Sequence, residues 1–515
     1  MRRLAALLLG LAIPLSSLAP VAAATTRTAE AGAVISWTPC PEEPAVECGT
    51  LAVPIDWNHP EGGTFNVGVA RHKATDPAAR IGALMLGAGG PGGSGVEMVF
   101  GSLKDLSPEI LRRFDVVSLD PRGTNRSHPV VCSIDLVMQG LPPIMKSQAD
   151  FDKMLAYNER LRADCRARTG PLFDHVDSIS TAADLDAFRA ALGEEKLSFW
   201  GVSYGTLLGQ QYAERYPRRV RAFTLDSTMD HSLDTQGFLD TEAWGAQDAF
   251  NEFVAWCERD SRCLQHDGDV RALWRELLAR ADRGDPSLSG LSGQEGTSMA
   301  AFTLIETATG LFYDPANWEY FSQFLAEVNG GRTSRLGPPP APFSGPPDVY
   351  PSPLQIFCLD YRLPVRDYRE YREHLRRLAK IAPDMRFSPI ALRLTAGCLG
   401  QPAPTPNPQR RLRVHTDTPL LVVNSLHDPA TVYPWAVSTA RQLGRSGRLL
   451  TYEGWGHGVY GRGACATGAV DSYLISQTLP TPGARCPAVP PSEVNPLRER
   501  VTPPLGTSGR LPYLF

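Results

Sequence analysis

Lysine and clustered charge are scarce in this sequence. Only six of its 51 basic residues are Lys, no run of five or more like charges occurs, and the basic residues nearly balance 55 acidic ones. Nucleic-acid grooves and electrostatic membrane anchors require clustered cations. We therefore expect no nucleic-acid partner for this chain of 515 residues.

Metal-binding motifs and long apolar runs are also missing. Neither C-x-x-C nor H-E-x-x-H occurs. Beyond residue 24, no apolar run reaches the roughly 18 residues that a membrane helix requires. We therefore expect no metal, no cofactor and no membrane anchor.

The first 24 residues are typical of a secretory signal peptide. Arg2 and Arg3 precede an apolar run over residues 4–15, and three alanines at 22–24 form a small-residue cleavage signal. The alternative is a buried N-terminal helix, which Pro14 and Pro20 disfavour. The sequence predicts export and an extracellular, soluble mature protein.

Ten cysteines agree with export, because an even number in an exported chain indicates disulfides. They are Cys40, Cys48, Cys132, Cys165, Cys257, Cys263, Cys358, Cys398, Cys465 and Cys486. They fall into five sequence-adjacent couples, which suggests pairing within each couple, although sequence alone does not determine the connectivity. A zinc site is the alternative interpretation.

Alternating strands and helices predict a parallel α/β sheet. A hairpin is expected over residues 50–57 and 64–72, followed by strands at 81–86, 114–119, 196–200 and 220–225. Helical patterns at 181–192 and 206–216 separate the later strands.

The pattern changes at about residue 231. Helical periodicity without a clear strand covers 241–260, 269–283, 298–312, 316–329 and 367–382, whereas strands resume at 419–424 and 448–452. We infer a signal peptide (1–24), a sheet core in two parts (34–230 and 411–490), a helical cap insertion between them (231–410) and a tail (491–515).

The motif Gly201-Val202-Ser203-Tyr204-Gly205 fits G-x-S-x-G. A predicted strand precedes it and a predicted helix follows, which is the context of a nucleophile elbow that holds Ser on a strained turn. Ser203 is the candidate nucleophile, and the alternative is a helix-capping Ser.

A serine nucleophile needs a base and an acid that orients the base. His457 lies in the glycine-rich stretch GWGHGVYG after a predicted strand, and Asp428 follows the strand PLLVVN. The order Ser203, Asp428, His457 is that of α/β hydrolases and differs from the chymotrypsin and subtilisin orders.

The glycine-rich stretch LMLGAGGPGGSG (84–95) contains G-x-G-x-x-G, which could bind a dinucleotide. No helix is expected promptly after the third glycine, and no acidic residue is well placed for a ribose. An oxyanion hole fits better, with backbone N–H groups of Gly90, or its neighbour Gly89, and of Tyr204.

Eight stretches resemble the secreted tripeptidyl aminopeptidases of actinobacteria, in the prolyl-aminopeptidase-like branch of the α/β hydrolases. They are CGTLAVPIDW, RHKATDPAARIGALML, GGPGGSG, DPRGTNRS, GVSYGT, CLD (358–360), HDPATVYPWA and GHGVYGRGAC. The resemblance runs from about residue 36 to 490. It implies an α/β-hydrolase fold with a large, mainly helical cap, and catalytic positions at Ser203, Asp428 and His457.

The resemblance has two departures. Gly87-Ala88 stands where relatives usually have Asn-Pro, beside the expected oxyanion loop, and Leu-Gly-Gln-Pro follows Cys398 where Trp-Pro is common. Both departures concern substrate preference and leave the three catalytic positions intact.

The resemblance implies a secreted serine exopeptidase that removes short peptides from free N-termini through an acyl-enzyme. The substrate ammonium group needs an anion, for which Asp360 and Glu97 are candidates; solvated or salt-bridged carboxylates are the alternative for both. We expect a monomer. An exported esterase or lipase with the same triad and a catalytically silent binding protein are the competing hypotheses.

Overall fold

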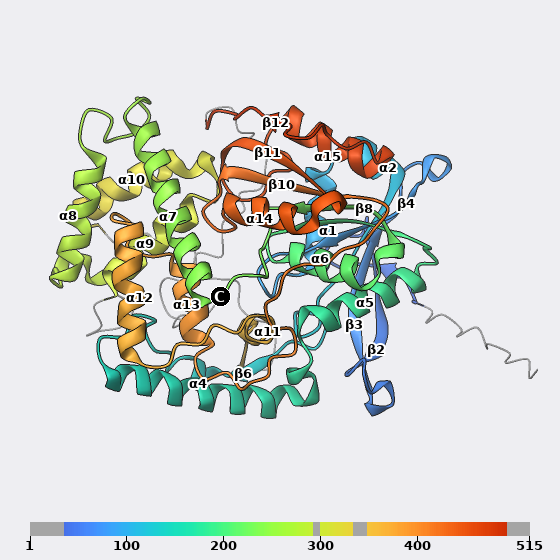
Figure 1. Ribbon diagram of the computed structural model, residues 1–515, viewed down its shortest axis with the longest axis horizontal. Coiled ribbons are helices and arrows are strands. Elements are labelled where there is room, and N and C mark those ends of the chain that lie inside the picture. The colour runs from blue at the N-terminus through green and yellow to red at the C-terminus, as the bar shows by residue number, and fades with distance from the viewer. Residues whose placement is uncertain (1–34, 292–298, 333–347, 492–515) are drawn as a thin grey trace, which may run out of the picture.

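The computed structural model describes residues 35–291, 299–332 and 348–491. A ten-stranded sheet runs through this part of the chain in the order β1-β2-β3-β5-β4-β7-β8-β10-β11-β12. Helices cover both of its faces, and a group of further helices lies beside it (Figure 1). The predicted architecture, a mostly parallel sheet flanked by helices, is confirmed.

The N-terminal end of the sheet is antiparallel. Its strands are β1 (Thr38–Pro39), β2 (Glu47–Pro54), β3 (Thr64–His72) and β5 (Phe114–Leu119). β2 and β3 form the predicted hairpin, although β2 begins at Glu47, three residues before the expected start. β3 then pairs antiparallel with β5, where the parallel part of the sheet begins.

The remaining strands are parallel: β4 (Gly82–Gly87), β7 (Leu197–Val202), β8 (Val220–Asp226), β10 (Leu420–His427), β11 (Gly447–Trp455) and β12 (Arg485–Cys486). Every residue of β4 and β5 is buried, as expected for strands that are covered on both faces. β10 lies between β8 and β11, so the late strands complete the sheet that the early strands begin.

Two apolar layers sandwich the sheet. On one face, strand side chains pack with α5 (Ser178–Ala191), α6 (Gly205–Arg215) and α14 (Tyr433–Leu443). On the other, they pack with α1 (Gly95–Asp105), α2 (Pro108–Arg113) and α15 (Ala464–Ser476). The C-terminal ends of the parallel strands are thereby held at one edge, where ligand sites of such sheets form.

Five helices beside the sheet fall in the segments whose periodicity predicts them. They are α7 (Thr235–Cys257), α8 (Val270–Asp282), α9 (Ala300–Leu311), α10 (Trp318–Asn329) and α12 (Tyr368–Ile381). Two shorter helices, α11 (Leu354–Asp360) and α13 (Pro389–Gly397), complete this group (Figure 1).

Two features of the helical part differ from the sequence-based expectation. The strand β9 (Val349–Pro351) pairs with β6 (Val131–Ser133), although no strand was expected there. The 22-residue helix α4 (Gln148–Thr169) was not predicted, and its buried side chains join the apolar cluster of α7 to α10. The predicted boundaries of the cap insertion, residues 231 and 410, therefore stay a proposal. The helix α4 packs with the cap helices but lies before residue 231.

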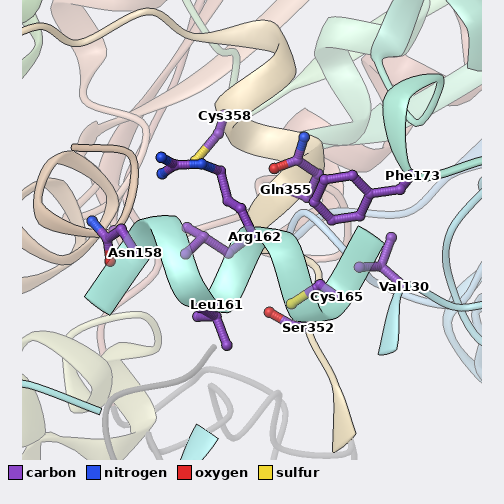
Figure 2. A pocket seen from close by; sticks show the side chains of 11 residues that line it. Val130, Asn158, Leu161, Arg162, Cys165, Phe173, Ser352, Gln355 and Cys358 are labelled. Carbon is purple, nitrogen blue, oxygen red and sulfur yellow. The ribbon is translucent and has the colours of Figure 1, made fainter. Parts of the chain in front are cut away.

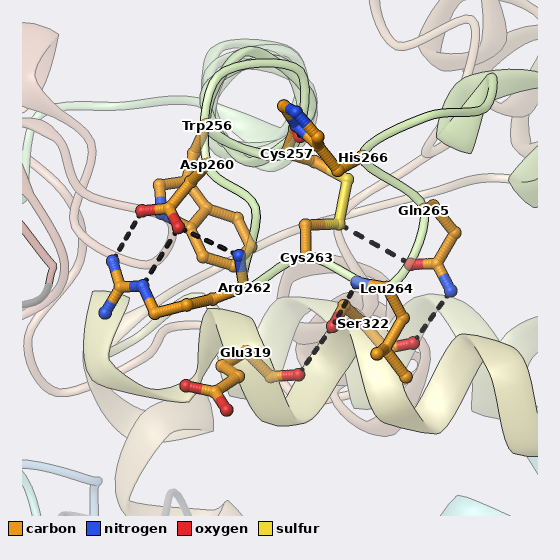
Figure 3. The surroundings of a disulfide bond; sticks show 10 residues. All are labelled: Trp256, Cys257, Asp260, Arg262, Cys263, Leu264, Gln265, His266, Glu319 and Ser322. Atoms are coloured by element: carbon orange, nitrogen blue, oxygen red, sulfur yellow. Dashed lines mark hydrogen bonds and ion pairs between the residues drawn. A yellow bond between two sulfur atoms is a disulfide. The ribbon is translucent and has the colours of Figure 1, made fainter.

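The structure joins all ten cysteines as 40–48, 132–165, 257–263, 358–398 and 465–486, the couples that adjacency suggests. Figure 3 shows Cys257–Cys263, which closes the turn after α7. Two residues after Cys263, Gln265 donates to the carbonyl of Ser322 on α10 at 3.0 Å. The disulfide thus helps to tie the end of α7 to α10.

Within the three described ranges, no helix combines the length and apolar character needed to cross a membrane. The predicted signal peptide and most of the C-terminal tail lie outside the described residues.

A fully buried ion pair joins the start of the sheet to α5. The Arg122 guanidinium donates to both oxygens of Asp184, at 2.7 and 2.6 Å, and also to the carbonyls of Pro54, Ile55 and His175. Both side chains have no exposed area. Among the described residues, each of these two charges has an ion pair with the other alone, so removing one partner leaves an unpaired buried ion.

We expect Asp184→Ala to lower the free energy of unfolding by about 3–5 kcal/mol, because it strands the Arg122 charge in the interior. Chemical denaturation measures this loss. The control is Glu276→Ala, which removes the exposed partner of Arg283 and should leave the denaturation midpoint nearly unchanged. A loss below about 1 kcal/mol for Asp184→Ala would contradict this account.

Candidate active site

Ser203 lies on the tight turn between β7 and α6. Its φ of 58° is in the left-handed region, which a non-glycine residue adopts only where the fold imposes it. The turn brings backbones close together, since a Cβ on Gly205 would lie 2.1 Å from the carbonyl oxygen of Gly87. The small residues of G-x-S-x-G are therefore required here, and Ser203 stays partly exposed.

Asp428 and His457 face each other at the ends of β10 and β11. The Nδ1 atom of His457 lies 3.1 Å from each carboxylate oxygen of Asp428. Asp428 is buried, and the His457 side chain is 9% exposed. This contact leaves Nε2 of His457 free of the carboxylate, as a base oriented from behind requires.

Several donors hold Asp428 as a carboxylate. The backbone N–H groups of Ala430 and Thr431 donate to Oδ1 at 2.9 and 3.0 Å, and the Thr431 hydroxyl donates to Oδ2 at 3.1 Å. Burial alone would raise the pKa of Asp428, but the charge of His457 and these hydrogen bonds hold the pKa below its usual range. Asp428 is therefore ionised at neutral pH.

Asp226, the last residue of β8, connects the Ser203 turn to the His457 loop. Its carbonyl accepts the N–H of Ser203 at 3.0 Å, and its carboxylate accepts the N–H groups of Val459 and Tyr460 at 2.7 and 2.9 Å. In the part of the chain that the structure describes, no hydrogen bond joins Ser203 Oγ to His457. Catalytic hydrogen bonds of free enzymes often tighten only with substrate.

The helical part holds the other side of the His457 loop. The His457 N–H donates to the carbonyl of Tyr313 at 2.8 Å, and the two rings meet edge to face at 4.9 Å. The buried Arg462 guanidinium donates to the carbonyls of His457, Gly458 and Tyr313. The position of His457 thus depends on residues that follow α9 as well as on the sheet.

The glycine-rich loop lies against Ser203 through Gly89. A Cβ on Gly89 would be 3.1 Å from the Cβ and 3.6 Å from the Oγ of Ser203. Asp120 braces the next turn, because its carboxylate accepts from Ser94 Oγ and from the Val96 N–H. The loop therefore has the proximity that an oxyanion hole needs, while the assignment of its donor to Gly90 or Gly89 stays a prediction.

The two carboxylates predicted to bind an ammonium group lie in different environments. Glu97 is 66% exposed in the first turn of α1, 3.7 Å from Arg126. Asp360 has no exposed area and already accepts from Ser178, Tyr204 and Asn407. Without access or a free lone pair, Asp360 is poorly suited to receive a substrate ammonium ion.

Glu242 on α7 is a buried carboxyl close enough to Asp428 for their charges to interact. It was not identified from the sequence. It accepts from Ser388 Oγ at 2.7 Å. Burial raises its pKa well above the usual range, and the charge of Asp428 raises it further. Because Glu242 is neutral, no second buried negative charge repels the Asp428 carboxylate from this position.

Asp226, Thr431, Tyr313 and Arg462 were also missed. Only Asp226 carried a usable signal: like Asp428, it is an acidic residue at the C-terminal end of a parallel strand. Thr431 acts through a single hydroxyl, and Tyr313 and Arg462 contact each other across a long stretch of sequence. No sequence pattern reveals such contacts.

Comparisons with known proteins agree with this geometry. Residues 82–464 match the alpha/beta hydrolase fold family. The chain is 32% identical to serine protease Hip1 of Mycobacterium tuberculosis, covering 88% of this chain and 91% of that protein. It is 30% identical to tripeptidyl aminopeptidase of Streptomyces coelicolor (88% and 86% covered) and 29% identical to carboxylesterase B of Mycobacterium tuberculosis (88% and 89%).

We expect Thr431→Val to lower kcat about 10-fold, because Asp428 loses one of the donors that fix its orientation toward His457. Steady-state kinetics on any substrate of the enzyme measures the loss. Thr431→Ser keeps the hydroxyl and should retain most of the activity. Equal activity of the Val and Ser variants would show that the hydroxyl has no such role.

We expect Gly89→Ala to lower kcat by about 10²-fold, because the added methyl group crowds Ser203 and displaces the loop. The matched control is Gly101→Ala on α1, where an added Cβ has no neighbour within 4 Å. The control should keep full activity. If Gly89→Ala is as active as the control, the loop does not approach the reacting atoms.

Proposed function

Because this chain belongs to the alpha/beta hydrolase fold family, we propose that it is a secreted serine exopeptidase that releases tripeptides from free N-termini. The observation that carries the proposal is the Ser203 turn at φ 58° beside a buried Asp428–His457 pair. Relatives named as a serine protease and a tripeptidyl aminopeptidase cover nearly the whole chain and support a peptidase.

The proposed reaction passes through an acyl-enzyme. His457 Nε2 takes the proton of Ser203 Oγ as this oxygen attacks the scissile carbonyl. The proton then passes from His457 to the leaving amine, which departs as the shortened peptide. Water, deprotonated by His457, releases the N-terminal tripeptide as a free acid. Asp428 stays ionised throughout and fixes the tautomer of His457.

Charge develops on the carbonyl oxygen in the tetrahedral intermediate. The N–H of Tyr204 and an N–H of the Gly89–Gly90 segment are the proposed donors to that oxygen. Loss of one such donor typically raises the barrier by about 3–4 kcal/mol. A glycine-rich loop serves this purpose because it exposes N–H groups without side chains between them and the substrate.

Secretion is part of the proposal. The five disulfides support an oxidising compartment, and the alanine-terminated apolar segment at residues 1–24 supports export. We propose a monomer that acts on peptides with a free N-terminus.

An exported esterase is the second candidate function. The relative named carboxylesterase B favours it, because the same nucleophile, base and acid hydrolyse esters as well as amides. The two candidates differ in their dependence on a free substrate N-terminus, which an esterase does not need.

We expect the protein to hydrolyse free tripeptide p-nitroanilides and to refuse their N-acetylated forms, because a charged N-terminus is part of the recognised substrate. A panel of mono-, di- and tripeptide p-nitroanilides, free and blocked, measures this preference. Equal turnover of free and blocked substrates, together with fast ester turnover, would favour the esterase.

We expect Ser203→Ala to lower kcat by about 10⁴-fold or more and to abolish labelling by a fluorophosphonate, because both require the Ser203 oxygen. The control Ser198→Ala removes a buried hydroxyl from the same strand, β7, and should keep activity and labelling. A wild-type protein that the probe does not label would point to the catalytically silent alternative.

A further inference from the structure

We propose that α11 positions the oxyanion hole, and that Asp360 at its C-terminal end is a positioning residue that acts through Tyr204. The inference rests on the function proposed above and deepens it. Asp360 binds Tyr204, Pro353 at the other end of α11 packs on Gly92, and a disulfide joins α11 to the end of α13.

Asp360 binds the side chain of the residue that follows the nucleophile. The Tyr204 hydroxyl donates to Oδ2 of Asp360, and the Tyr204 ring is buried. Since the N–H of Tyr204 is a proposed oxyanion donor, a fixed ring limits the rotation of the peptide that carries this N–H. Asp360 itself has no exposed area, so it meets no substrate.

The surroundings of Asp360 are built for a fixed carboxylate. Ser178 donates through its N–H at 2.9 Å and through its hydroxyl, and Asn407 donates at 2.7 Å. Within the described residues, no cation pairs with Asp360. Burial, and then the charge of Asp177, raise the pKa of Asp360 to about 7, while the hydrogen bonds oppose this shift. Without a paired cation, the buried carboxyl depends on these hydrogen bonds, which fix its position.

The opposite end of α11 lies on the glycine-rich loop. Pro353, the residue that precedes α11, packs directly on Gly92: a Cβ at Gly92 would lie 2.4 Å from the Cβ of Pro353. Gly92 has a φ of +100° and lies two residues after Gly90. One short helix therefore contacts both segments that carry the proposed oxyanion donors.

The position of α11 is maintained from behind. Cys358 bonds to Cys398, the residue after α13, and the Phe357 ring packs on the Phe238 ring of α7 with 5.8 Å between the ring centroids. Between α11 and α4 lies a hollow, lined in part by Arg162 and Gln355 (Figure 2). Packing against α4 is thus incomplete on this side. The disulfide, the Asp360 hydrogen bonds and the buried side chains of Ile356, Phe357 and Leu359 together hold the helix.

A double-mutant cycle tests the proposal with Tyr204→Phe, Asp360→Asn and the double variant. We expect each single change to lower kcat about 10-fold with little change in KM, because only the transition state uses the oxyanion donors. The double variant should lose no more than Asp360→Asn alone, since both single changes break the Tyr204–Asp360 contact. The substrate is a free tripeptide p-nitroanilide.

The matched control is Tyr212→Phe. Tyr212 lies on α6, the helix that follows Tyr204, is equally buried, and donates to Asp186 at 3.0 Å. It lies far along the helix from the Ser203 turn, so its loss should leave kcat unchanged even if the protein is less stable. Equal losses of kcat in Tyr212→Phe and Tyr204→Phe would overturn the proposal.

A second readout separates this inference from the peptidase proposal. The rate of Ser203 labelling by a fluorophosphonate depends on the triad and the oxyanion hole, whatever the natural substrate is. If the wild type is labelled but cleaves no peptide amide, the peptidase proposal fails, and the labelling rates of the variants decide the role of α11. An unlabelled wild type overturns both.

The remaining outcomes are decisive as well. Independent effects that multiply to about 100-fold in the double variant, or a raised KM with unchanged kcat in Asp360→Asn, would overturn the positioning role. If Asp360→Asn does not fold, Tyr204→Phe decides alone, because it keeps the ring and removes only the hydroxyl that Asp360 binds.

Discussion

The buried carboxylate of Asp226 is the contact on which the geometry of the site depends. The backbone carbonyl of Asp226 accepts the N–H of Ser203, and its carboxylate accepts the N–H groups of Val459 and Tyr460. These partners are more than 230 residues apart in the chain, and a single residue at the end of β8 sets their separation. Neither the left-handed Ser203 turn nor the His457 loop is positioned by local sequence alone.

The helical part does more than cover the site. Tyr313 accepts from the His457 N–H and from Arg462 in the same loop, and α11 contacts both the glycine-rich loop and Tyr204. A serine nucleophile on a strained turn needs partners that do not move, because a displacement of about 1 Å costs a large factor in rate. The helical part therefore also influences how well Ser203 and His457 are aligned.

Much of the sheet could be predicted from sequence, because strands such as Phe114–Leu119 are continuous apolar runs and their alternation with helices is regular. The fold and the family are confirmed on this basis. The helix α4 was not predicted, although its buried residues Phe151, Met154, Leu161 and Cys165 recur at helical spacing; charged residues interrupt them, so the segment has no continuous apolar run. The roles of Asp226 and Asp360 also escaped, since a carboxylate shows its function only through partners that the fold brings to it, such as Val459 for Asp226 and Tyr204 for Asp360.

The place of β10 between β8 and β11 has a consequence for how the chain acquires its shape. β8 ends at Asp226, whereas its parallel neighbour begins at Leu420, so nearly 200 residues are made before that edge can be closed. Until then, the backbone groups along one side of β8 have no partner and form a template for strands of other molecules. Such long-range pairing is slow, and a newly made chain is most open to aggregation during this interval.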